Sequence, residues 1–340
     1  MEETMKFITI GELLMRLSPP NYEKIRTTNS FVLNYGGAEA NVAVSLANLG
    51  VDSTVFSVVP DNDIGKSCIR YLKANDVHTS PILFSGERLG LYFLEEGISV
   101  RASQVIYDRR YSAFAEYDYA DTDMEAVLRG YDWLHLSGIT PALSLNCRVL
   151  MEKALKAAKK LGMTVSFDLN FRSKLWKFDE ARDVLSTYMP YVDVLIGIEP
   201  LHLYNKEGGD VKDGLSMQPG YEDMDRVFKA LDERFHFKAI GRHVRFVHSS
   251  NENSLMAYLY KDGKTYESNL MRFNILDRVG GGDAFSSGMI FALMEDMEGA
   301  EAVNFAVASS VMKHSIHGDT NITDKESIMR LMNNTFEIQR

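Results

Sequence analysis

The clearest chemical signal in this chain comes from four consecutive residues, Gly280, Gly281, Gly282 and Asp283. Glycines let the backbone adopt positive φ and let an anion approach without a Cβ in the way. The apolar run over 285–294 predicts a helix directly after them, so the free N–H groups of its first turn would point at that anion. A carboxylate repels phosphate, but it is useful there if it takes a proton from an attacking hydroxyl. The glycines therefore predict an anion hole for phosphoryl transfer, and the aspartate its general base. The alternative for the aspartate is a simple helix cap.

A second glycine pair stands before a predicted helix near the N-terminus. Gly36 and Gly37 precede residues 38–49, whose apolar side chains recur at helical spacing. The backbone there can approach a ligand closely, and Asn41, one turn into the helix, is placed to hydrogen-bond it. A Gly-Gly before a helix is also a common structural junction. The pair therefore indicates a binding site only when it is taken together with the later glycines.

Strand-like and helix-like segments alternate through most of the chain, which predicts an α/β fold with a mainly parallel central sheet covered by helices. Two stretches, 13–33 and 91–116, are rich in aromatic and β-branched residues and lack a helical period. They predict a small separate β-sheet that lies over the cleft as a lid. Residues 1–12, 34–90 and 117–340 are then the main domain, which binds nucleotide and substrate.

The expected strands of the main sheet lie at 6–10, 53–59, 133–136, 164–167 and 192–196. The expected helices lie at 38–49, 64–75, 148–161, 285–294 and 302–314.

The bulk composition is that of an ordinary globular protein of 340 residues, with 45% hydrophobic and 25% charged residues. A net charge of −10 argues against general affinity for nucleic acid or anionic membranes, so anionic ligands would need local arginines and helix N-termini. No signal peptide and no run of about 18 apolar residues is visible. The only cysteines, Cys68 and Cys147, form no ligand pattern. We expect a cytoplasmic protein.

Together, Gly36-Gly37-(x)3-Asn41 and Gly280-Gly-Gly-Asp283 resemble the paired signatures of the ribokinase-like (PfkB) carbohydrate kinases, and the resemblance spans nearly the whole chain. It implies a ribokinase-like three-layer fold with a β-sheet lid. It also implies that the first glycines line the sugar site and that the late glycines form the anion hole. Asp283 would then deprotonate the terminal hydroxyl of a sugar as it attacks the γ-phosphate of ATP, with Mg²⁺ bridging the phosphates.

Within the family, several stretches are similar to 2-keto-3-deoxygluconate kinases. They are Gly11-Glu-Leu-Leu-Met-Arg-Leu-Ser-Pro, Gly90-Leu-Tyr92, Tyr107-Asp-Arg109, Leu136-Ser-Gly-Ile-Thr-Pro and Phe167-Asp-Leu-Asn-Phe-Arg172. The resemblance implies that the keto acid is bound by Gly37, Tyr92, Tyr107, Arg109 and Arg172.

The chemistry of arginine supports a sugar acid as the substrate. A guanidinium recognises a carboxylate through two parallel hydrogen bonds. Arg109 lies on the predicted lid and Arg172 just after a main-sheet strand, so lid closure could bring both onto one carboxylate. The alternative is that Arg109 belongs to a solvated face and that Arg172 pairs with a nearby acid.

The chain departs from the family pattern mainly near the nucleotide. Arg278 stands where the commonest pattern has threonine, and Gly241 lacks the usual neighbouring hydroxyl. The segment around Ile198 retains only Glu199 as a candidate Mg²⁺ ligand, acting through water. On family grounds alone, Asp277 is a candidate ligand for a monovalent cation such as K⁺.

Three functions remain open at this point: a keto-sugar-acid kinase, which we favour; a kinase of a neutral sugar or nucleoside, such as fructokinase; and a non-catalytic binding protein of the same fold. The gluco and galacto epimers of the keto acid are not distinguished by the sequence. Exposed strand edges and apolar residues on the lid, such as Phe31, Leu33 and Phe93, predict a homo-oligomer, a dimer at minimum.

Overall fold

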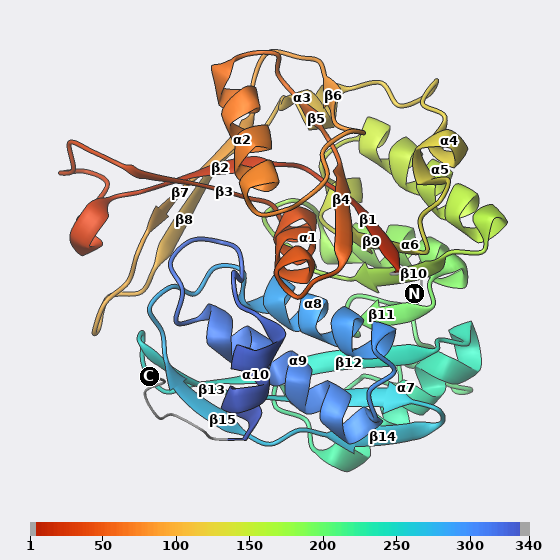
Figure 1. Cartoon of the computed structure of the whole chain (residues 1–340). Coiled ribbons are helices and arrows are strands. Elements are labelled where there is room, and N and C mark those ends of the chain that lie inside the picture. Colours follow the sequence, from red (N-terminus) through yellow and green to blue (C-terminus); the bar gives the residue numbers. More distant parts are fainter. Residues whose placement is uncertain (1–4, 334–340) are drawn as a thin grey trace.

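The central sheet of the computed structural model, which describes residues 5–333, has the strand order β14-β13-β12-β11-β10-β9-β1-β4, with β15 also paired to β13 (Figure 1). All neighbours from β12 to β4 are parallel, and β13 joins β12, β14 and β15 in antiparallel fashion. The strands are β1 (Lys6–Ile10), β4 (Asp52–Phe56), β9 (Trp133–Ser137), β10 (Thr164–Asp168), β11 (Val194–Ile196), β12 (Ala239–Val247), β13 (Glu252–Lys261), β14 (Lys264–Glu267) and β15 (Met271–Asn274).

Helices cover both faces of this sheet. They are α1 (Ala38–Asn48), α2 (Asp63–Ala74), α3 (Ala113–Glu116), α4 (Met124–Leu128), α5 (Leu145–Leu161), α6 (Phe178–Tyr188), α7 (Tyr221–Phe235), α8 (Gly281–Met294), α9 (Gly299–Lys313) and α10 (Lys325–Met332). Single 3₁₀ turns occur at Pro20–Tyr22, Thr140–Ala142 and Met189–Tyr191. Over the described part of the chain, none of these helices combines the length and the apolar character that a membrane span requires.

The strands of the sheet are buried on both sides, which makes the fold three-layered. In β1, Ile8 packs with α4 to α7, whereas Phe7 packs with α1, α2, α8 and α9 on the opposite face. Successive side chains of a strand point to opposite faces, so a parallel strand covered on both sides must be apolar throughout. This explains the continuous apolar runs that predicted these strands. The α/β architecture expected from the sequence is confirmed.

A second sheet has the order β3-β2-β7-β8 and extends to the left of the main body in Figure 1. Its strands are β2 (Leu14–Ser18), β3 (Val32–Gly36), β7 (Gly90–Glu95) and β8 (Gln104–Asp108). One face carries Arg16, Tyr92 and Tyr107 in adjacent register. These strands lie where the small sheet was predicted; the exact division of the chain into lid and main domain stays a prediction.

Three expectations about individual elements differ from the structure. Residues 53–59 were expected as one strand, but β4 ends at Phe56 and a separate short strand, β5 (Val58–Val59), pairs with β6 (Leu83–Phe84). Residues 113–116 form a helix within the stretch read as strand, because one helical turn is too short to show a period. Helix α8 begins at Gly281, four residues before the predicted start, because the glycines themselves form its first turn.

Candidate active site

The N-terminus of α8 is an open anion-binding turn. Gly280, its N-cap, has φ 81° and ψ −2°, in the left-handed region that favours glycine. A Cβ at this position would lie 1.8 Å from the carbonyl oxygen of Asp319, so no other residue fits. No side chain of the described residues caps the helix, and the first-turn N–H groups have no acceptor within the helix. Gly282 has open space where a Cβ would point. This is a ready site for an anionic oxygen.

Asp283 lies in that first turn and is held by α1. The side-chain amide of Asn41 donates from Nδ2 to Asp283 Oδ2 over 2.6 Å. One turn further along both helices, Ser287 and Ser45 form a second hydrogen bond of 2.7 Å. The two helices lie side by side in Figure 1. The two glycine-led helices of the sequence therefore meet at their first turns.

Burial raises the pKa of Asp283 from its ordinary value of 3.8 to about 7. The Asn41 amide opposes this rise because it favours the ionised carboxylate, while the charge of Asp168 adds to it. A carboxylate that titrates near neutral pH is a much stronger base than an ordinary aspartate and is still ionised in much of the protein. These are the properties of a general base.

Two further carboxylates stand close to Asp283, and each is held by hydroxyls. Asp168, at the end of β10, accepts from Ser286 over 3.0 Å, and Glu39 accepts from Ser137 and Thr140 over 2.7 and 2.9 Å. Burial raises the pKa of both acids. Three acids in one region need compensating cations.

Four arginines near this region have no ion-pair partner among residues 5–333: Arg172, Arg242, Arg245 and Arg278. Burial lowers the pKa of Arg242, and burial together with the charges of Arg278 and Arg172 lowers that of Arg245. Half-buried guanidinium groups that repel one another are costly unless an anion binds there. The cluster is suited to a ligand with several negative charges.

A pocket opens at the carboxyl ends of β10, β11 and β12, the usual ligand side of an open parallel sheet. It is lined by Asp168, Ile196, Gly197, Ile198, Glu199, Arg242 and His243. Glu199 Oε2 is 3.0 Å from the ammonium of Lys212, and its side chain is 45% exposed. The carboxylates of Asp168 and Glu199 are hard oxygen ligands of the kind that Mg²⁺ takes through water. These residues therefore fit a hydrated Mg²⁺.

The lid residues predicted to bind the keto acid are placed differently from one another. Arg109 is paired with Glu12, donating from Nε over 2.8 Å and also from Nη2. Tyr107 is 43% exposed, with its ring beside that of Tyr92 and the guanidinium of Arg109 over it. Tyr92 is buried, and its hydroxyl donates to Asp319.

Arg109 is paired with Glu12, whereas Arg172 is exposed and has no ion-pair partner among the described residues. Gly37 has φ 144°, and a Cβ there would lie 2.2 Å from the carbonyl oxygen of Glu12. Glycine is therefore required where β3 meets α1.

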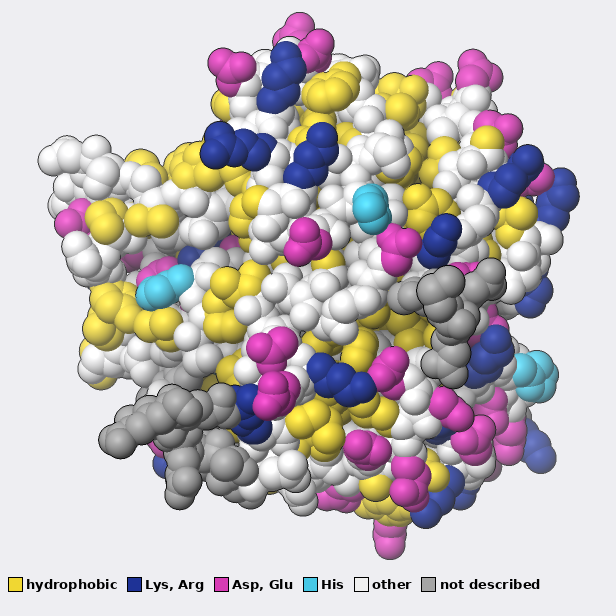
Figure 2. All heavy atoms as spheres, in the orientation of Figure 1, with side chains coloured by type: hydrophobic (Ala, Val, Ile, Leu, Met, Phe, Trp, Pro, Cys, Tyr) yellow, Lys and Arg dark blue, Asp and Glu magenta, His cyan; other side chains and the backbone are white. Residues whose placement is uncertain are grey.

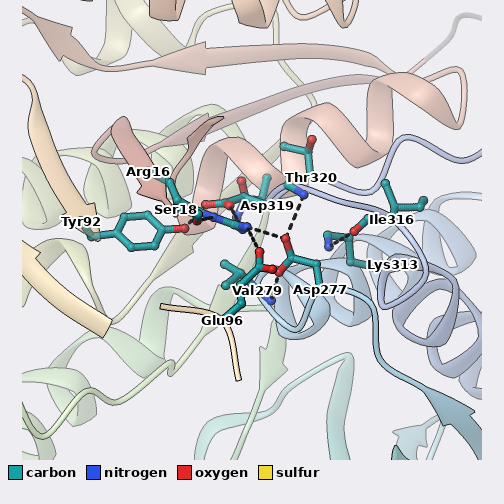
Figure 3. A network of polar contacts seen from close by, with 12 residues as sticks. Arg16, Ser18, Tyr92, Glu96, Asp277, Val279, Lys313, Ile316, Asp319 and Thr320 are labelled. Atoms are coloured by element: carbon teal, nitrogen blue, oxygen red, sulfur yellow. Dashed lines mark hydrogen bonds and ion pairs between the residues drawn. The ribbon is translucent and has the colours of Figure 1, made fainter. Parts of the chain in front are cut away.

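Asp277 is buried in the turn before α8 and is already ion-paired within the chain (Figure 3). Arg16 donates from Nη2 to Asp277 Oδ2 over 2.6 Å and from Nη1 to Asp319 Oδ1 over 2.8 Å. Its remaining contacts are Glu96 Oε1 at 3.1 Å and Ser18 Oγ at 2.9 Å.

Five residues of this region received no role from the sequence: Glu12, Arg16, Asp168, Arg242 and Arg245. Glu12 and Asp168 stand at or just after the end of a predicted strand, where an acid is exposed to the ligand side of the sheet. Their position at a strand end could therefore have marked Glu12 and Asp168 as candidate site residues in the sequence. Arg16 stands among the apolar residues Leu14, Met15 and Leu17 of its strand, and its distant acidic partners show why it is buried.

A helix N-terminus free to bind an anion, a base beside it and a cationic pocket at the strand ends are the parts of a phosphoryl-transfer enzyme. Consistent with this, the profile of the pfkB family carbohydrate kinases matches residues 5–326, and the chain belongs to this family. The ribokinase-like fold and the carbohydrate-kinase class predicted from the sequence are confirmed.

The similar proteins include sugar-acid kinases. The 2-dehydro-3-deoxygalactonokinase of Haloferax volcanii is 30% identical over 332 residues, covering 97% of each chain. A crystal structure of 2-dehydro-3-deoxygluconokinase from Thermotoga maritima has a TM-score of 0.91 and 38% identity, covering 97% of this chain and 99% of that one. A double mutant of Vibrio cholerae fructokinase, with fructose, ADP and potassium bound, has a TM-score of 0.71 over 98% of this chain and 100% of that one. At 18% identity it shows the fold alone.

The first prediction concerns Asp283. Asp283→Asn should lower kcat by about 10²- to 10⁴-fold, the usual effect of losing a general base, while substrate binding persists. It should also stabilise the protein at pH 8. Because the pKa of this acid is higher in the folded state, its stabilising contribution is lost as the pH rises through 7. We expect a gain of about 2–4 kcal/mol in unfolding free energy at pH 8 that shrinks toward pH 4. Near-normal turnover in this variant would remove the assignment.

The second prediction concerns Asn41. Its N–H favours the ionised form of Asp283, so Asn41→Ala should move the acidic limb of the kcat/KM–pH profile to higher pH. The profile of the wild type should fall below pH 7. Asn48→Ala is the matched control, because Asn48 lies on the same helix and only bonds the backbone oxygen of Val44. An equal shift in both variants would contradict the assignment.

Proposed function

We propose that this protein transfers the γ-phosphoryl group of ATP to the terminal hydroxyl of a keto-sugar acid, 2-keto-3-deoxygluconate or its galacto epimer. The observation that carries this proposal is the placement of Asp283: a carboxylate with a pKa near 7, in the open first turn of α8. The two sugar-acid kinases described above act on these epimers, which are also named 2-dehydro-3-deoxy acids.

In this mechanism the sugar hydroxyl loses its proton to Asp283 as its oxygen attacks the γ-phosphorus. The N–H groups at residues 281–283 stabilise the charge that develops on the transferred phosphoryl oxygens. Asn41 keeps the carboxylate oriented before and after it takes the proton. The phosphoryl group leaves ADP, and Asp283 later releases its proton to water.

The nucleotide is assigned to the pocket at the ends of β10 to β12. Its negative charge would balance the guanidinium of Arg242, which lines this pocket and has no ion-pair partner among the described residues. Mg²⁺ would be held through water by Asp168 and Glu199, and when bound it would neutralise the phosphates. Of the positions where the chain departs from the family pattern, 278 is itself an arginine, and Gly241 is followed by Arg242.

The carboxylate of the substrate is assigned to Arg172, which is exposed at the edge of this site and has no ion-pair partner among the described residues. Gly37, Tyr107 and Arg109 complete the proposed sugar site. Arg109 makes no hydrogen bond through Nη1 within residues 5–333, so it can bind an anion while it stays paired with Glu12. For Tyr92 we propose a supporting role through Asp319 and Tyr107.

A neutral sugar is a second candidate, favoured by one observation. The charge of Arg109 is already balanced by Glu12. Within the proposed sugar site this leaves Arg172 as the one unpaired arginine that would select for an acid. We also propose that residues 13–33 and 91–116 form the closing lid. A cytoplasmic location is a further proposal. It is supported by two buried cysteines without a disulfide.

The third prediction tests the substrate class by Mg²⁺-dependent ADP release with both keto-acid epimers, fructose and ribose. We expect the keto acids to have the highest kcat/KM. Arg172→Ala should lower kcat/KM for the acids by about 10- to 100-fold, the effect of losing a charge-assisted hydrogen bond, and leave fructose nearly unchanged. Arg129→Ala, an exposed arginine after α4, is the control. Preference for fructose, or equal losses for acids and neutral sugars, would sink the keto-acid proposal.

We also propose that the outer face of the lid joins two copies of the chain. Leu33, Leu17, Phe93 and Ile106 form a row across β3, β2, β7 and β8, on the face opposite Arg16. Leu33 and Ile106 are about half exposed, and Figure 2 shows hydrophobic side chains gathered on this part of the surface. Such an apolar face is costly in water unless it is covered.

The fourth prediction follows from this row. Light scattering at micromolar concentration should give at least twice the chain mass of 38.4 kDa. Leu33→Asp should shift the protein toward monomer, because a carboxylate would be buried without a partner. Val100→Asp is the control, since Val100 is 99% exposed in the loop between β7 and β8. A monomeric wild type would contradict the proposal.

A further inference from the structure

Arg16 is the largest fully buried side chain of the described residues, with 1% of its surface exposed. It comes from β2 of the small sheet and contacts three carboxylates from separate segments (Figure 3). Glu96 follows β7, Asp277 precedes α8, and Asp319 follows α9. Burial by itself lowers the pKa of a guanidinium, but Asp319 and Asp277 raise that of Arg16 above its ordinary value. Arg16 is therefore a permanent buried cation.

The carboxylates around Arg16 support the glycine turn from two sides. Asp277 Oδ1 accepts from the N–H of Val279 over 3.1 Å, which shapes the backbone leading into Gly280. On the other side, the carbonyl oxygen of Asp319 packs against the α-carbon of Gly280 so closely that a Cβ would overlap it. Arg16 binds both acids, so it holds the turn between them.

The family resemblance marked Asp277 as a candidate ligand for a monovalent cation, but its surroundings do not fit one. Besides Val279 and Arg16, the carboxylate accepts from the N–H of Gly318 over 3.0 Å, so both oxygens already bind donors. An ion there would leave the guanidinium buried without its partner, which is strongly unfavourable.

A wider group of possible ligands does not change this result. Oxygen and nitrogen atoms of Glu96, Asp277 and His317 lie within 4.8 Å of one another. Arg16 Nη2 already contacts the first two, at 3.1 and 2.6 Å, and would repel a cation bound between them. A second buried cation, Lys313, donates to the carbonyl oxygen of Ile316 over 3.0 Å nearby. The side chains of Arg16 and Lys313 thus already supply positive charge beside the carboxylates that flank the glycine turn.

We propose that Arg16 is a positioning residue that replaces a bound monovalent cation, so that this kinase works without K⁺ or Na⁺. The fixed guanidinium neutralises Asp277 and Asp319 and orders the turn at 277–280 that receives the phosphoryl group. The inference rests on the kinase class alone and holds for whichever sugar the enzyme accepts.

The first arm of the test uses the wild-type enzyme with its best substrate. Turnover is measured in KCl, NaCl and tetramethylammonium chloride at equal ionic strength and saturating MgATP. If Arg16 replaces the ion, kcat should differ by less than about twofold between the salts. The thermal unfolding midpoint should not depend on K⁺. Activation by K⁺ of fivefold or more over tetramethylammonium would overturn the proposal. Absence of activity on keto acids would not, because the unfolding measurement needs no substrate.

The second arm uses Arg16→Gln, which removes the guanidinium from the carboxylates and opens space beside them. In tetramethylammonium its kcat should fall at least tenfold, with a smaller change in the KM for ATP. KCl or guanidinium chloride should restore kcat saturably, at least fivefold, and K⁺ should raise the unfolding midpoint of this variant only. Arg272→Gln, which removes an exposed arginine paired with Glu252, is the control and should behave as wild type.

Two results would refute the proposal that Arg16 replaces an ion. One is a wild-type kcat in Arg16→Gln, and the other is a lowered kcat that no small cation restores. If Arg16→Gln does not fold, Arg16→Lys takes its place, because it keeps a charge in the same space. That variant should retain turnover that does not depend on K⁺, and activation of it by K⁺ of fivefold or more would count against the proposal. Loss of activity in Arg16→Lys without any response to K⁺ would count against it.

Discussion

The proposed base and the phosphate that it would serve are both negatively charged, and the structure around Asp283 accommodates that constraint. Asp283 lies in the open first turn of α8, where backbone N–H groups offset its charge and are free to bind an anionic oxygen. Burial raises its pKa to about 7, so the carboxylate readily accepts a proton. The unpaired arginines on β12 and in the turn at 278 supply the cationic surroundings that a triphosphate needs.

The turn that we propose to receive the phosphoryl group is held by a residue of the small sheet. Gly280 lies between the segments that carry Asp277 and Asp319, and Arg16 of the small sheet binds both acids. Tyr92, from the neighbouring strand, reinforces Asp319. The small sheet therefore carries Tyr107, proposed to bind the sugar, on β8 and the support of the glycine turn on β2, with β7 between them. A change in the position of one affects the other, because they share a backbone ladder.

Much of the fold was visible in the sequence because its signals are local. Glycines before an apolar run indicate a helix N-terminus, and apolar strands between amphipathic helices indicate a covered parallel sheet. Both glycine-led helices were predicted, and they meet through Asn41 and Asp283. The expected meeting of Arg109 and Arg172 on one carboxylate of the substrate stays a prediction. In this structure Arg109 is paired with Glu12, which lies beneath the lid just beyond the end of β1.

By itself, the sequence determined the alternation of strands and helices over much of the chain, the glycine turn with its aspartate, and the class of chemistry. Tertiary structure alone decided which charges are paired and which remain free for ligands. Arg16 and Asp319 are 303 residues apart, and Asn41 and Asp283 are 242 apart. Spacing along the chain describes neighbours within a few turns of helix or strand, whereas an ion pair depends on distance and burial in space. Those quantities exist only once the chain has folded.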